Sequence, residues 1–285
     1  MATREPSYIA LHRAGELACR AETLVAGLEP CQICPRDCAV NRLQGEHGYC
    51  RSGRRAKVSS CGPHFGEEAP LVGQGGSGTI FLANCNLLCI FCQNYDISHL
   101  SEGTEVEPER VADMMLSLQE RGCHNINFVS PTHLVPQIVE ALDMAAAQGL
   151  RLPLVYNCGG YESVATLELL EGIFDIYMPD AKYSSGEVAA QLSEAPDYPE
   201  RMRESIREMH RQVGDLELDD GGIALRGLLV RHLVLPNGRA GTKEIMEFLA
   251  SLSANTYVNV MAQYRPCYNA GDVEAIGRRL APEEY

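Results

Sequence analysis

Residues 78–94 read GTIFLANCNLLCIFCQN, an apolar strand candidate at Thr79–Ala83 followed at once by three cysteines. Cys85, Cys89 and Cys92 stand in a Cys-x3-Cys-x2-Cys spacing. Three thiolates can hold three irons of a [4Fe–4S] cluster, and the fourth iron then stays open to a small molecule. The alternatives are a zinc site or three unrelated buried cysteines. Structural zinc usually takes four ligands, and no fourth ligand is obvious nearby.

Beyond this segment, short apolar runs alternate with helical patterns to the end of the chain. The further strand candidates are Ile126–Ser130, Leu154–Asn157, Ile176–Pro179, Leu228–Leu235 and Tyr257–Ala262. The helical stretches between them include Pro108–Gln119, Val135–Ala147, Val164–Leu170 and Thr242–Ser251. Strand-then-helix repetition predicts parallel strands joined by right-handed crossovers. Six such units predict an α/β fold with a partial (β/α)6 barrel, and an eight-stranded barrel is the runner-up. Chemistry is then expected at the carboxyl ends of the strands.

Composition narrows the class of protein. The 285 residues include twelve cysteines, eight of them between residues 31 and 92, and carry a formal charge of −14. Neither an export signal nor an apolar run of about 20 residues is recognisable, so we expect a soluble, cytoplasmic protein without membrane contacts. In a reducing compartment, clustered cysteines are better explained as metal thiolates than as disulfides. The acidic charge without a basic run argues against nucleic-acid binding.

A second group of cysteines precedes the first strand. Cys31, Cys34, Cys38 and Cys50 lie within twenty residues, in a segment rich in Gly, Arg and Pro. Four thiolates at this density can form a zinc knot or hold a second iron–sulfur cluster, and the short spacings suit both. The sequence predicts a metal here and leaves its identity open.

These patterns divide the chain into four parts. Residues 1–30 are an N-terminal helical segment, 31–78 a cysteine-rich metal-binding extension with little periodicity, 79–270 the barrel, and 271–285 a C-terminal tail. The interval 184–222 is longer than the other crossovers and contains a charged helical run, PERMRESIREMHRQV. We interpret this run as a solvated helix and assign it no chemistry.

The spacing of the cysteine triad, Phe91 just before its last cysteine, and the strand–loop context resemble the radical S-adenosylmethionine (SAM) superfamily. The resemblance implies that the open iron binds the amino and carboxylate groups of SAM. One electron from the cluster then cleaves SAM to methionine and a 5′-deoxyadenosyl radical, which abstracts hydrogen from a substrate. The cofactors carry this chemistry, and the protein orients them and excludes competing reactions.

The same resemblance assigns cofactor contacts to Phe91 and to residues at later strand ends. Asn157, in Tyr-Asn-Cys-Gly-Gly, occupies the position that often contacts ribose or methionine. Asp180-Ala-Lys182 resembles the Asp-x-Lys motif of glycyl-radical activating enzymes, in which Lys meets the SAM carboxylate. Arg231, in Arg-His-Leu-Val-Leu-Pro, is similar to a further SAM contact of those enzymes. A cation at a strand end suits a carboxylate ligand.

Taken together, the motifs resemble radical SAM proteins described as homologues of pyruvate formate-lyase activating enzyme. The resemblance implies an oxidoreductase of activating-enzyme type, an electron donor such as flavodoxin or ferredoxin, and an unidentified protein or small-molecule substrate. Activation of a protein glycine is the first candidate reaction that the resemblance implies. The alternative from another class is an iron–sulfur electron-transfer or scaffold protein without SAM chemistry.

Overall fold

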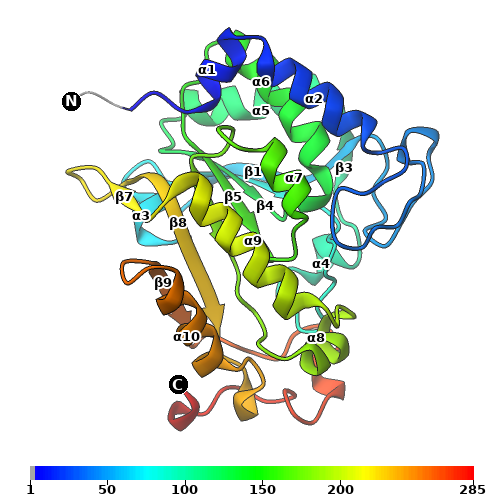
Figure 1. Ribbon diagram of the computed structural model, residues 1–285, viewed down its shortest axis with the longest axis vertical. Coiled ribbons are helices and arrows are strands. Elements are labelled where there is room, and N and C mark those ends of the chain that lie inside the picture. Colours follow the sequence, from blue (N-terminus) through cyan, green and yellow to red (C-terminus); the bar gives the residue numbers. More distant parts are fainter. Residues whose placement is uncertain (1–3) are drawn as a thin grey trace.

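Six parallel strands form the centre of the computed structural model, which describes residues 4–285 (Figure 1). The strands are β2 (Ser77–Leu82), β4 (Ile126–Val129), β5 (Leu154–Cys158), β6 (Ile176–Pro179), β8 (Ala224–Leu233) and β9 (Tyr257–Met261). They pair in this order, each parallel to the next. The partial (β/α)6 barrel is therefore confirmed, and the eight-stranded alternative is wrong. Each predicted strand overlaps an observed one.

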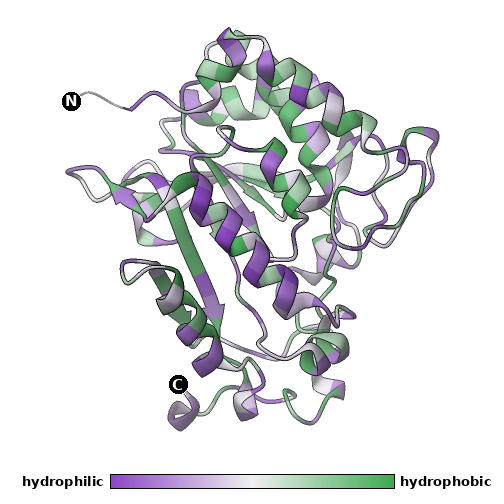
Figure 2. Cartoon of the chain, viewed as in Figure 1, coloured by the Kyte–Doolittle hydropathy of each residue, from purple (hydrophilic) through white to green (hydrophobic). Residues whose placement is uncertain are grey.

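Helices connect the strands and cover the outer face of the sheet. They are α5 (Pro108–Glu120), α6 (Val135–Ala147), α7 (Val164–Leu169), α8 (Gly186–Ser193), α9 (Tyr198–Val213) and α10 (Thr242–Leu252). The charged run predicted to be helical is α9, whose polar residues appear as purple bands in Figure 2. Met202, Ile206 and Met209 recur at helical spacing and are fully buried, so α9 packs one apolar stripe inward.

The N-terminal part folds onto the barrel. Helices α1 (Tyr8–Arg13) and α2 (Glu16–Ala26) match the predicted helical segment, of which residues 1–3 lie outside the described part. The extension contains a nine-residue strand, β1 (Ala56–His64), that the sequence analysis missed. β1 pairs antiparallel with β2 and with the short β3 (Thr104–Val106). Cys61, Gly62 and Pro63 lie within β1, and Gly and Pro are residues that ordinarily argue against a strand.

Further short elements are two helices and one strand, and a C-terminal tail follows the last strand of the barrel. They are α3 (Ala69–Val72), α4 (Tyr95–Ser98) and β7 (Glu217–Leu218), with 3₁₀ turns at Ala270–Asp272 and Pro282–Glu284 near the C-terminus. The Tyr285 hydroxyl donates to the carbonyl of Val260 on the edge strand β9, at 3.2 Å. The tail is thereby fastened to the last strand. Within residues 4–285, no helix has the length and apolar character that crossing a bilayer requires.

The start of the chain is anchored by one buried carboxylate. Asp175, which is 2% exposed, accepts hydrogen bonds from the backbone N–H and hydroxyl of Ser7 and from the N–H of Leu154. Asp175 precedes β6 and Leu154 begins β5, so the carboxylate joins two neighbouring strands to the N-terminal segment. Without it, three donors would lose their acceptor.

We therefore expect Asp175→Ala to lower the free energy of unfolding by about 3 kcal/mol, measured by urea denaturation. The matched control is Asp113→Ala. Asp113 is exposed and forms a loose surface ion pair with Arg110, at a distance of 3.9 Å. Loss of that surface pair should cost about 0.5 kcal/mol or less. Equal losses in the two variants would contradict the anchoring role of Asp175.

Candidate functional site

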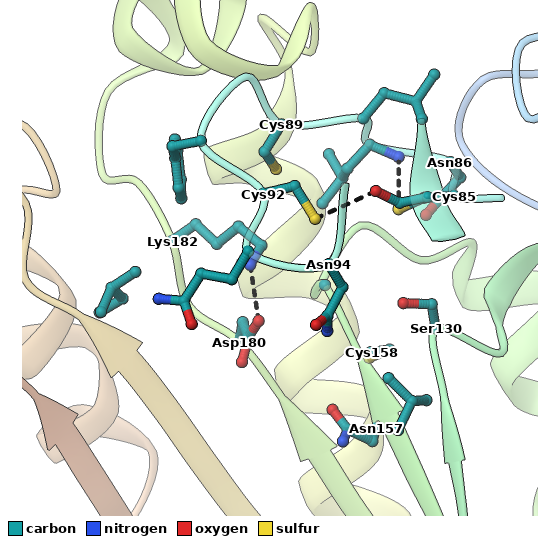
Figure 3. Close-up of a pocket in the computed structure, with 18 of the residues that line it drawn as sticks. Cys85, Asn86, Cys89, Cys92, Asn94, Ser130, Asn157, Cys158, Asp180 and Lys182 are labelled. Carbon is teal, nitrogen blue, oxygen red and sulfur yellow. Dashed lines mark hydrogen bonds and ion pairs between the residues drawn. The ribbon is translucent and has the colours of Figure 1, made fainter. Parts of the chain in front are cut away.

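A cavity of about 280 Å³ lies at the carboxyl ends of the parallel strands, beside the cysteine triad. Parallel strands place all their carboxyl ends at one edge, so successive loops contribute to one cavity. Cys85, Cys89 and Cys92 line it from the loop after β2, as Figure 3 shows. Asn157 lines it from the end of β5, and Lys182 lines it from the segment after β6. The triad and the later strand ends predicted from sequence therefore meet at one cavity.

The loop that carries the triad is held in an irregular conformation. Leu88 has a φ of 51°, in the left-handed region, which costs about 1–2 kcal/mol for a residue with a side chain. Each cysteine sulfur also accepts a hydrogen bond: Cys85 from the Leu87 N–H at 3.3 Å, Cys92 from the Ser98 hydroxyl at 3.2 Å, and Cys89 from the Ser193 hydroxyl at 3.0 Å. Donors aimed at sulfur are a feature of thiolate sites, because such hydrogen bonds stabilise the negative charge.

Burial and, to a lesser extent, the neighbouring Cys89 raise the pKa of the Cys85 thiol to about 12. Burial likewise raises the pKa of Cys92. Without a cation these thiols stay protonated at neutral pH, and binding of a metal would displace their protons. The loop thus has the donor set of a metal–thiolate site.

Two cations and two carboxylates form a nearly buried network below the triad. Lys182 Nζ lies 2.7 Å from Asp180 Oδ2, and Arg231 Nε lies 2.9 Å from Asp180 Oδ1. Arg231 also contacts Glu67 Oε1 at 3.1 Å and the Asn157 side-chain oxygen at 2.7 Å. Every nitrogen of the guanidinium therefore has a partner. Burial opposes ionisation of Asp180, but Arg231 and Lys182 outweigh it and lower its pKa.

Glu67 enters this network from the segment between β1 and β2. Its carboxylate accepts hydrogen bonds from Asn127 and Asn157 inside the barrel, at 3.0 Å and 3.2 Å. Its neighbour Glu68 instead binds Asn259 on the edge strand β9. The sequence analysis gave Glu67 no role, because nothing local signals a contact with residues up to 164 positions away.

Phe91 and the interval 184–222 also contribute side chains to the site. Phe91 is 6% exposed, lines the cavity, and makes edge-to-face contacts with Tyr183 and Tyr264. The interval 184–222 supplies Ser193, which precedes the charged run and whose hydroxyl reaches Cys89. Only a long-range contact links these two residues, so the sequence carried no signal for it.

The four N-terminal cysteines line a separate small hollow. Cys31, Cys34, Cys38 and Cys50 all border it, together with the fully buried Arg42. Cys38 accepts a hydrogen bond from the Tyr49 N–H at 3.3 Å, and a Cβ on Gly48 would lie 2.7 Å from its sulfur. The close approach therefore requires glycine at position 48.

No group of three or more His, Cys, Asp or Glu side chains in residues 4–285 is arranged to hold a single metal ion. A [4Fe–4S] cluster has a different requirement, because each thiolate binds its own iron and the ligands stand farther apart.

Comparisons with family models and with curated proteins identify relatives of this chain. A family model described as the radical SAM superfamily matches residues 79–216. A curated relative, Uncharacterized protein MJ0674 of Methanocaldococcus jannaschii, is 33% identical over 264 residues, which cover 89% of this chain and 71% of the relative.

Solved structures are similar at lower identity. Native anSMEcpe with bound AdoMet and Cp18Cys peptide matches with a TM-score of 0.47 and 9% identity, over 71% of this chain and 54% of that one. Native anSMEcpe with bound AdoMet matches with a TM-score of 0.45 and 9% identity, over 71% of this chain and 55% of that one. The chain thus spans about half the length of these structures.

A buried carboxyl in the wall behind the cavity gives a pH-dependent prediction. Glu162 is 3% exposed and accepts hydrogen bonds from Thr132 and Tyr156, both at 2.8 Å. Burial raises its pKa from 4.5 to about 7. A raised carboxyl pKa contributes stability below the unfolded-state value of 4.5, and this contribution is lost as the pH rises through about 7.

Relative to Glu162→Gln, the wild type should therefore lose about 2.5 kcal/mol of unfolding free energy between pH 5 and pH 8. Urea denaturation of both proteins across this range measures the difference. Parallel stability profiles would show that Glu162 titrates near its ordinary pKa.

Proposed function

Because the chain belongs to the radical SAM superfamily, we propose that Cys85, Cys89 and Cys92 hold a [4Fe–4S] cluster that binds and reductively cleaves SAM. The observation that carries the proposal is that these three thiols line the same cavity as Asn157 and Lys182. Three thiolates leave one iron without a protein ligand, as SAM binding requires. A cluster held by these thiolates would supply, when reduced, the one electron that cleaves SAM to methionine and a 5′-deoxyadenosyl radical.

The surrounding residues suit the binding of SAM. Lys182 keeps its charge, because burial lowers its pKa but Asp180 and Cys89 raise it more strongly. Its ammonium group can therefore meet the SAM carboxylate. Arg231 and Asp180 hold Lys182 and Asn157 in place, and Phe91 contributes an apolar wall.

The substrate that we propose first is a protein glycine. The support is the Asp180-Ala-Lys182 segment, which matches the Asp-x-Lys pattern of glycyl-radical activating enzymes and lies at the end of β6. Hydrogen abstraction would leave a carbon-centred radical on the substrate and form 5′-deoxyadenosine. The electron would come from a one-electron donor such as flavodoxin or ferredoxin.

For the N-terminal hollow, we propose a second metal, either an auxiliary iron–sulfur cluster, whose ligands stand farther apart, or zinc, for which the four cysteines would have to move together. A buried imidazole supports this proposal. His133 lines the hollow, and its Nε2 lies 2.9 Å from the carbonyl of Ala83. Burial lowers its pKa to about 4, so the ring is neutral and Nε2 carries the proton. Nδ1 is then an acceptor, and it finds no hydrogen-bond partner among residues 4–285.

The decisive experiment is the assay of 5′-deoxyadenosine from SAM, using anaerobically reconstituted, dithionite-reduced protein with iron and zinc counted on the same sample. Product with about four irons supports the radical enzyme with zinc at the N-terminal site, and about eight irons indicates a second cluster. A fully loaded protein that forms no product, with or without candidate substrates, would favour the electron-transfer alternative.

Cys89→Ala should abolish 5′-deoxyadenosine formation, because two thiolates no longer complete the triad. Cys123→Ala is the matched control, since Cys123 is buried but does not line the cavity. Product from the Cys89 variant at the wild-type rate would refute the assignment of the triad.

Glu67→Gln should weaken SAM binding about tenfold, because Asn157 and Arg231 lose the carboxylate that fixes them; tenfold corresponds to about 1.4 kcal/mol. Glu68→Gln changes the neighbouring carboxylate, whose hydrogen bonds go to Asn259 on the edge strand, and should weaken SAM binding less than Glu67→Gln does. Equilibrium binding to reconstituted protein distinguishes the two. Equal affinities in the two variants would remove Glu67 from the binding network.

A further inference from the structure

Arg36 joins the cysteine-rich extension to the loop that carries the triad. It lies in the Cys-Pro-Arg-Asp-Cys segment, between Cys34 and Cys38. Its guanidinium donates to the backbone carbonyls of Asn86, at 2.8 Å, and of Leu87, at 3.5 Å. Both residues lie between the first two cysteines of the triad.

The same guanidinium reaches a third segment. It donates to the carbonyl of Ser193, at 2.8 Å, and to that of Glu194. These residues end helix α8, and the Ser193 hydroxyl donates to Cys89 Sγ. The carbonyl of Leu192 in turn accepts from the Ile90 N–H at 3.0 Å. Arg36 thus holds the triad loop directly and also fixes the residue that hydrogen-bonds a triad sulfur.

Two aromatic rings keep the guanidinium in place. Its carbon lies 3.7 Å from the ring centre of Tyr49 and 5.2 Å from that of Tyr161. The Tyr49 hydroxyl also donates to the carbonyl of Leu87, at 3.4 Å. In Figure 1, residues 31–55 form the blue loops beside α4, and Arg51 of this region donates to the carbonyl of Ser98 in that helix. The contacts with the triad loop are therefore repeated along the extension.

Arginine is the side chain that this position requires. The four carbonyls lie in irregular backbone or at a helix end, where regular secondary structure provides no donor. A planar group with five N–H donors can serve several of them at once, whereas a lysine ammonium is a compact point charge.

We propose that Arg36 is a positioning residue for the cluster site, which fastens the extension onto the triad loop and holds the three thiolates in the arrangement that binds the cluster. The extension is then part of the active site, in addition to the metal proposed for its own cysteines. This inference deepens the proposed function and rests on it.

Hydrogen exchange in the metal-free full chain tests the fastening itself. In Arg36→Ala, the amides of residues 84–92 should exchange about tenfold faster than in the wild type, and Arg36→Lys should not restore protection. Arg54→Ala is the matched control. It removes another guanidinium of the extension, one that pairs with Glu140 on α6. Its exchange in residues 84–92 should equal that of the wild type.

Release of iron to a chelator tests the consequence in reconstituted protein. The electron paramagnetic resonance signal that changes on addition of SAM should disappear about tenfold faster in Arg36→Ala and in Arg36→Lys than in Arg54→Ala. Thermal unfolding of the metal-free variants controls for a general loss of stability. Equal exchange and equal iron release in the Arg36 and Arg54 variants would overturn the inference. A wild-type chain that takes up iron but gives no SAM-dependent signal would instead overturn the proposed function, while hydrogen exchange would still decide the role of Arg36.

Discussion

Parallel pairing of six strands is the constraint on which the site depends. Because each crossover returns the chain to the same end of the sheet, residues from six separate segments arrive at one edge. The register of β4, β5 and β6 places Val129, Asn157 and Met178 side by side. The side chains that follow them therefore share one cavity, although about fifty residues separate the first from the last. A single slip in this register would turn Asn157 away from the barrel interior.

The polar interior of the barrel is balanced charge by charge. Arg231 and Lys182 provide two positive charges, and Asp180 and Glu67 provide two negative ones. Buried charges are tolerated when each is paired and its remaining hydrogen bonds are satisfied. The lining of the barrel is therefore polar and can bind a ligand. Each of these four charged groups has a partner of opposite charge. Glu67 is the contribution of the extension to this balance, as Arg36 is its contribution to the triad loop.

The sequence predicted the features that depend on local pattern. The six strands and the helices between them lie within a few residues of their predicted positions, because apolar periodicity and turn residues report local conformation. The triad was recognisable for the same reason, since its three cysteines are neighbours in the chain. β1 was missed because it contains Cys61, Gly62 and Pro63, and Gly and Pro ordinarily argue against a strand. Glu67, Arg36 and Ser193 were given no role because their partners lie 50 to 164 residues away.

The contacts of Arg36 can form only in a set order during synthesis of the chain. Its partners at Asn86 and Leu87 emerge from the ribosome about fifty residues after it, but Ser193 and Glu194 follow only after a further hundred. At a synthesis rate of about 5–20 residues per second, the segment that supports Cys89 is made on the order of 10 s after the triad cysteines. During that interval the thiols are present without their final neighbours. Under the proposed function, iron inserted on the growing chain would meet this loop before Arg36 has all of its carbonyl partners, the last of which is Glu194.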